Sequence, residues 1–238
     1  MVALSRGFFS DRSPGRGLIT TATNSTPPGE ITPVVGEKKS GSALATTCVL
    51  SVTAAIGDTL LAWAYSHDDN FVSIVAASGV AGGFVFRSGV GTHLKFYEGY
   101  VTATMTGVNV TSTYSSNSGQ SFIILPIRGA YNRTLTFFDP NALIPVTAGP
   151  NDSTGQNLNI STTNPRSFLV YACAAKGPLV NISDPAGWTG IANTGYVLAD
   201  LASWYKIVNA PQSVLNVNPT TSDAHETSSL GDGINGRL

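Results

Sequence analysis

The densest group of reactive side chains in this chain is Ser-His-Asp-Asp-Asn at residues 66–70. Imidazole, carboxylate and amide groups are ligands for Zn²⁺ or Ca²⁺. Consecutive residues on an extended loop point in different directions, so this cluster supplies only part of either ligand set. We therefore predict no metal site here.

Residues for acid–base or nucleophilic catalysis are few and do not form a motif. The chain has three histidines, His67, His93 and His225, and no Gly-x-Ser-x-Gly elbow. A glycosidase needs two opposed carboxylates, and Asp58, Glu98, Asp139 and Asp200 cannot be paired from sequence. Asp58 and Asp139 lie beside Gly or Pro and are expected to serve turns. No phosphate loop or dinucleotide fingerprint appears. We predict no catalytic residue, no cofactor and no enzymatic activity.

Aromatic side chains could provide a platform on which sugar rings stack. Most of them, including Trp63 and Trp204, fall in the middle of strand-like segments, where core packing is expected. Trp188 differs, because it follows the turn-forming residues Asp184-Pro-Ala-Gly. It is the one candidate ligand contact, with a cap at the end of the fold as the alternative.

Charge limits the partners that the chain can have. The net charge is −1, and the 13 basic residues are scattered without interleaved aromatics, so we expect no nucleic-acid partner. Arg6, Arg12 and Arg16 form a small cluster that either anchors an N-terminal arm or is simply solvated. The chain lacks an apolar run of membrane-spanning length and a signal-peptide pattern, so neither membrane insertion nor export is predicted.

Composition favours a β-rich protein that assembles. Charged residues make up 11% of the chain, against an average of about 25%. A surface with so few charges stays soluble through hydroxyl and amide groups or is buried in an assembly. Cys48 and Cys173 both lie in apolar segments, where cysteine is a small buried hydrophobe, and whether they form a disulfide is left open.

The elements that position these residues are predicted to be short strands. Alternating or apolar runs separated by Gly, Asn, Ser and Asp indicate strands, and no segment has a convincing helical period with a cap and a stop. This spacing is typical of a sandwich or barrel. The expected strands cover residues 46–53, 59–66, 71–76, 84–87, 94–102, 108–114, 121–128, 158–161, 167–174, 179–182, 188–191, 196–208 and 214–218.

A faint duplication links the two halves of the chain. Residues 52–65 match residues 160–173 in their pattern of alternation, corner and apolar run, at an offset of 160 − 52 = 108. Leu94-Lys-Phe-Tyr and Ala202-Ser-Trp-Tyr continue the match at the same offset. Two similar half-units are therefore predicted, at about 46–130 and 157–220.

The predicted organisation has three parts. Residues 1–43 contain frequent Gly and Pro and are expected to form an extended arm. Residues 44–221 form one antiparallel β-sandwich of jelly-roll type that contains the pseudo-repeat. Residues 222–238 form a polar tail, because the segment that should match the apolar strand 121–128 is polar. The fold class is all-β.

Several short patterns resemble a group of β-sandwich proteins from tailed-phage structural modules and bacterial surface proteins. They are Gly57-Asp58 before Leu60-Leu-Ala, the later Phe-Tyr or Trp-Tyr strand, Ile127-Arg-Gly, and Pro-Ala-Gly-Trp-Thr at residues 185–189. The resemblance covers roughly residues 45–220. It implies capsid decoration, a head fibre or a tail appendage, commonly as a trimer, and it brings no catalytic residues.

The expected function is that of a non-enzymatic virion structural protein, assembled in the host cytoplasm through multivalent contacts. Its partners would be other virion subunits, including copies of itself as a homo-oligomer, with a trimer favoured. Loss of residues 1–43 should abolish assembly and leave the sandwich folded. The alternative is a carbohydrate- or host-receptor-binding module that uses a host-surface glycan and an exposed Trp188.

Overall fold

The computed structural model describes residues 31–68, 71–129, 137–177, 180–195 and 198–235. The described chain is almost entirely antiparallel β-structure. Its one helical segment among these residues is the 3₁₀ turn Val35–Glu37. The all-β prediction and the low helix content are confirmed for this part of the chain.

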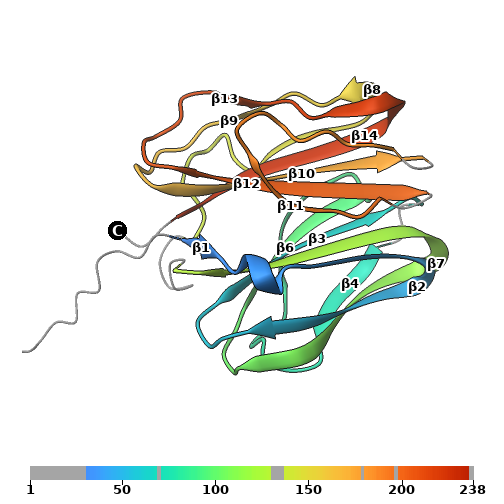
Figure 1. The fold of residues 1–238 in the computed structure, drawn as a ribbon, viewed down its shortest axis with the longest axis vertical. Coiled ribbons are helices and arrows are strands. Elements are labelled where there is room, and N and C mark those ends of the chain that lie inside the picture. Colours follow the sequence, from blue (N-terminus) through green and yellow to red (C-terminus); the bar gives the residue numbers. More distant parts are fainter. Residues whose placement is uncertain (1–30, 69–70, 130–136, 178–179, 196–197, 236–238) are drawn as a thin grey trace, which may run out of the picture.

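The first half of the chain builds a seven-stranded sheet in the order β1-β7-β3-β6-β5. β7 is 24 residues long and merges two predicted strands. β2 also pairs with β7, and β3 and β4 follow one another along β7, so the sheet curls into a half-barrel (Figure 1). The strands are β1 (Thr32–Pro33), β2 (Lys39–Ala54), β3 (Thr59–Ser66), β4 (Phe71–Ala76), β5 (Val85–Val90), β6 (Leu94–Tyr100) and β7 (Met105–Arg128).

The second half builds a five-stranded sheet in the order β11-β12-β10-β14-β8 and a small two-stranded ladder. The ladder joins β9 and β13 and lies over the outer side of this sheet (Figure 1). The strands are β8 (Val146–Gly155), β9 (Leu158–Ile160), β10 (Ser167–Lys176), β11 (Thr189–Asn193), β12 (Ala199–Val208), β13 (Leu215–Val217) and β14 (Thr220–Asn235).

Three hydrophobic clusters hold these layers together. The largest lies between the two sheets and combines Trp63 and Phe96 from the first with Phe168 and Leu201 from the second. A second fills the half-barrel around Phe122. The third lies between the five-stranded sheet and the β9–β13 ladder, around Trp204. The two sheets therefore pack face to face through a shared core.

The topology corrects the jelly-roll part of the prediction. Each half of the chain forms its own sheet, whereas consecutive strands of a jelly roll alternate between two sheets. The register at the centre of the first sheet illustrates this arrangement, because β3 pairs with β6 and β7 from the same half of the chain. Trp63 pairs with Phe96 on one side and with Ile123 on the other.

The predicted boundaries also need correction at both ends. β2 begins at Lys39, inside the segment assigned to an arm, and pairs with β7 from that residue onward. The segment assigned to a polar tail is β14, which lies between β10 and β8 and is buried from Thr227 to Asn235. Its small and polar residues are accommodated by pairing with β10 and β8, while Leu230 and Ile234 belong to the shared core.

Candidate functional site

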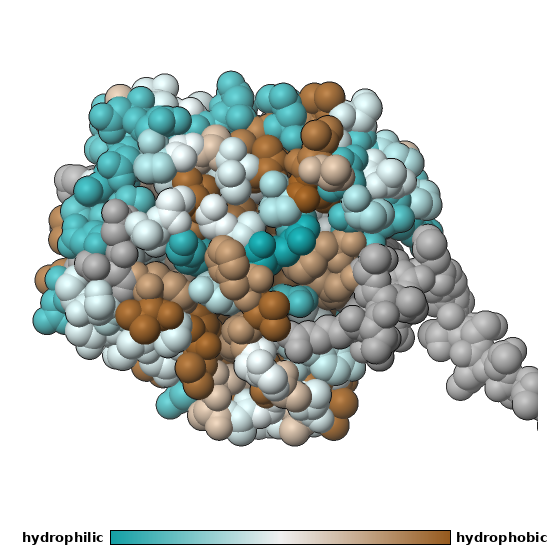
Figure 2. Space-filling model, turned by 180° about the vertical axis from the view of Figure 1, so that it is seen from behind, coloured by the Kyte–Doolittle hydropathy of each residue, from teal (hydrophilic) through white to brown (hydrophobic). Residues whose placement is uncertain are grey.

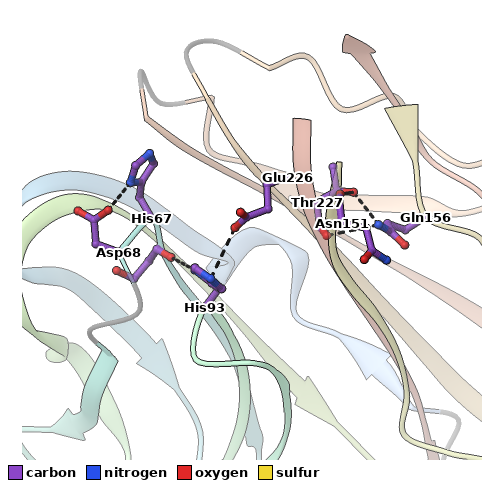
Figure 3. Close-up of polar contacts among 8 residues, drawn as sticks. His67, Asp68, His93, Asn151, Gln156, Glu226 and Thr227 are labelled. Atoms are coloured by element: carbon purple, nitrogen blue, oxygen red, sulfur yellow. Dashed lines mark hydrogen bonds and ion pairs between the residues drawn. The ribbon is translucent and has the colours of Figure 1, made fainter. Parts of the chain in front are cut away.

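A histidine from the first half of the chain contacts a glutamate of the second sheet (Figure 3). His93 lies in the turn between β5 and β6, and Glu226 belongs to β14. The Nε2 atom of His93 lies 3.6 Å from Oε1 of Glu226, and its Nδ1 atom lies 3.1 Å from the carbonyl oxygen of Ser66. The imidazole is buried, with 9% of the residue exposed.

This geometry suits a structural link between sheets. A carbonyl oxygen only accepts hydrogen bonds, so Nδ1 of His93 carries the hydrogen and donates it to Ser66. Nε2 faces the Glu226 carboxylate. Both ring nitrogens are thus engaged with groups other than a hydroxyl nucleophile.

The predicted polar cluster at residues 66–70 is placed only in part. His67 contacts its neighbour Asp68, with 2.6 Å between Nδ1 and Oδ1 (Figure 3). Asp69 and Asn70 lie outside the described residues. In the described part of the chain, no group of three or more His, Cys, Asp or Glu side chains could hold a metal ion.

A second polar group in the same view ties β8 to β14. The Gln156 side chain donates to Oγ1 of Thr227 at 2.8 Å, and that hydroxyl donates to the Asn151 carbonyl at 3.2 Å (Figure 3). Gln156 and Thr227 are buried, whereas Asn151 is exposed at the edge strand β8. The contacts satisfy buried polar atoms, which otherwise cost free energy.

Two of the four carboxylates considered for catalysis, Asp58 and Asp139, hold turns and neighbouring backbone, while Glu98 and Asp200 are buried. Asp58 accepts the backbone N–H of Ala55 and pairs with Arg128 at 2.8 Å. Asp139 accepts N–H groups from Asn141, Thr163 and Asn164. Burial raises the pKa of Asp139, but these hydrogen bonds outweigh it and leave the pKa below its usual value. The turn roles predicted for Asp58 and Asp139 are confirmed.

Sequence reasoning missed a buried ion pair between the sheets. Arg87 of β5 donates to Asp232 of β14 at 2.7 Å, and its guanidinium lies 3.9 Å from the ring centre of Phe138. Burial raises the pKa of Asp232, and Arg87 opposes that effect. Asp232 is buried because it lies in the buried part of β14. The residue types of β14 do not predict that burial.

One shallow depression of about 250 Å³ lies beside the other ion pair, Asp58 with Arg128. Its wall includes Val34, Ala54 and Met105. Arg128 donates two hydrogen bonds to the Asp58 carboxylate. Asp58 and Arg128 are therefore already paired with each other in this depression, whose wall also includes Glu37.

The half-barrel presents a broad outer face without charge, which we call the β2–β7–β4 face. Val49 of β2 and Val75 of β4 both pair with Thr111 of β7 and form one row across it. Leu44, Val49, Val72 and Val75 are 49–59% exposed. Residues 40–57, 71–86 and 99–127 contain no Asp, Glu, Lys or Arg. In the view from behind, apolar and pale residues alternate over the half-barrel (Figure 2).

The remaining predicted residues fall in different places. Trp188 is buried to 9% exposure in the cluster under the β9–β13 ladder, with its ring 6.2 Å from that of Tyr171. Its faces are thus not available for sugar stacking. Arg6, Arg12 and Arg16 lie outside the described residues. Cys48 and Cys173 are free thiols in two separate clusters.

Comparison with known proteins gave no match to a protein-family model, a curated protein or a solved structure. Among the described residues, no helix has the length and apolar character needed to cross a bilayer.

Proposed function

We propose that this chain is a non-enzymatic structural subunit of a tailed-phage virion, which decorates or stabilises the capsid or forms a tail appendage. It acts in the virion, after assembly in the host cytoplasm, as a homo-oligomer with a trimer favoured. The observation that carries the proposal is the uncharged β2–β7–β4 face with its exposed valines and leucine. Exposed apolar surface of this kind marks contact sites between proteins.

The size of this face favours many weak contacts over one strong one. A face three strands wide and about six residues long covers about 300 Å², from the strand spacing and rise. A stable interface buries about 800 Å² on each partner. One such face cannot hold two subunits together, so stability must come from several contacts at once.

We also infer that the two sheets descend from a duplicated unit. Trp63 pairs with Phe96 and Ile123, and Tyr171 pairs with Trp204 and Gly231. Each residue of the second set lies 171 − 63 = 108 positions after its counterpart. The strand orders β2-β7-β3-β6-β5 and β8-β14-β10-β12-β11 correspond position by position. This agreement supports the pseudo-repeat and extends it into β14.

Removing the N-terminal arm tests the assembly role. A truncated chain should begin at Ile31, because a start near residue 42 would delete Lys39 to Gly41 from β2, where they pair with β7. We expect light scattering to give an oligomer for the full chain and a monomer for the truncated one. The circular dichroism spectrum should keep its β-sheet form. A full-length chain that is monomeric at all concentrations would contradict the proposal.

A further inference from the structure

β2 has one open edge. It pairs with β7 along its full length, and β7 is its only strand partner among the described residues, although β11 comes near it. Its other edge therefore carries backbone N–H and C=O groups that β7 does not use. Such an edge is a template for pairing with another strand.

Beyond Lys39, the open edge lacks charged residues and proline, which are two of the usual protections against pairing. Lys39, at its first position, is the only charged residue of β2, and the strand contains no proline. By contrast, the edge strand β8 contains Pro150 and Asp152, and both residue types discourage pairing. Irregularities in register at Ala45/Thr47 and Val52/Ala54 bracket a regular run, Thr47–Val52. This run is the part of the edge that another strand can join.

We propose that Thr47–Ser51, within this run, pairs antiparallel with the same segment of a second copy, about a two-fold axis at Val49. The proposal rests on the assembly role only in taking the partner to be the chain itself. A two-fold contact cannot lie within a three-fold ring, so this contact would join one oligomer to another. Directly opposed residues in an antiparallel pair lie on the same face of the sheet. A two-fold axis at Val49 therefore places Thr47 opposite Ser51 and Cys48 opposite Leu50.

The residue types match this register on both faces. Cys48 and Leu50 are buried inside the half-barrel, so the inner face of the pair would be apolar against apolar. Thr47, Val49 and Ser51 are exposed on the outer face, where hydroxyls would meet hydroxyls and valine would meet valine. No charged residue lies opposite its own copy across the axis. The pair would also join two β2–β7–β4 faces into one continuous surface.

Engineered cysteines test the register directly. Residues opposed across an antiparallel pair have Cα atoms about 4.5–5.5 Å apart, within the range that a disulfide spans. We expect Val49→Cys to give a covalent dimer under mild oxidation, visible on a non-reducing gel. Thr111→Cys is the matched control, since it lies in the same row but on the central strand. It should stay uncross-linked.

Two further controls make the test specific. Wild-type chain should not cross-link, because Cys48 and Cys173 are buried and burial raises the pKa of each thiol to about 11. Val75→Cys places the thiol on the opposite edge strand, β4. Cross-linking through Val75 but not Val49 would overturn the proposed register.

Charge at the axis provides an independent readout. Val49→Lys puts two like charges against each other across the two-fold axis, so we expect its mass by light scattering to fall relative to wild type. Thr111→Lys should keep the wild-type mass. If Val49→Cys does not cross-link and Val49→Lys keeps the wild-type oligomer, the edge contact is wrong and the assembly role stands. If the full-length chain is monomeric, the assembly role fails as well.

Discussion

At the scale of single residues, the ion pair between Arg87 and Asp232 is a buried polar link between the sheets. Asp232 is fully buried and Arg87 is 24% exposed. A carboxylate without water needs its partner, because an unpaired buried charge is costly. The shared core therefore depends on a charge pair as well as on its apolar side chains.

Replacing Arg87 should destabilise the protein in a pH-dependent way. We expect Arg87→Ala to lower the free energy of unfolding by about 3 kcal/mol at neutral pH. Arg87 holds down the pKa of Asp232, which burial raises, so its loss lets that pKa rise further. The native state of the variant then binds a proton on Asp232 more tightly. The loss in free energy of unfolding should therefore shrink as pH falls through the raised pKa of Asp232.

Urea denaturation at neutral and mildly acidic pH measures this effect. The exposed Arg166→Ala substitution is the control and should leave stability unchanged at both pH values. A deficit for Arg87→Ala that is equal at both pH values would mean that lost packing on Phe138, rather than the unpaired carboxylate, causes it.

At the scale of elements, β14 decides whether the second sheet exists. It pairs with β10 on one side and with β8 on the other. Without β14, β8 loses its partner and β10 becomes an edge. The end of the chain is therefore a central structural element of the second sheet.

Truncation after Thr221 should abolish folding of the second sheet. It removes most of β14, including Leu230 and Ile234 of the shared core. We expect loss of native β-sheet signal in circular dichroism, or an insoluble chain. Truncation after Asn235 is the control and should fold like wild type, since it leaves β14 whole. A folded, soluble chain ending at Thr221 would contradict this role of β14.

At the scale of the whole molecule, the two sheets share one core and should unfold together. Trp63 of the first sheet lies in the cluster that also contains Phe168 and Leu201 of the second. If one sheet unfolds, the side chains that the other sheet contributes to this cluster become exposed to water. The halves are thus expected to behave as one cooperative unit, despite each having its own sheet.

Fluorescence can follow each sheet separately. Variants that keep only Trp63 report on the first sheet, and variants that keep only Trp204 report on the second. We expect the two denaturation curves to coincide, as in two-state unfolding. Two separated transitions would show that the sheets are independent domains.

Local pattern in the sequence was sufficient for many strands. β3 and β4 have the predicted ends, and β10 extends the predicted strand by two residues. These segments are rich in β-branched, aromatic and apolar residues between turn residues, so their local preference and their final environment agree. The turn roles of Asp58 and Asp139 could be predicted for the same reason, since each caps a turn in its own neighbourhood.

Tertiary structure alone decided the rest. β8 contains Gly and Pro, and β14 is rich in Ser, Gly and Asp, so neither has a strong local preference for a strand. Each is held by pairing with residues far along the chain, and a buried polar residue such as Asp232 is stable only beside a partner 145 positions away. The sequence by itself determined an all-β chain, and its faint duplication is the basis for proposing two similar halves. Only long-range pairing decided that each half closes its own sheet and which edge is left open.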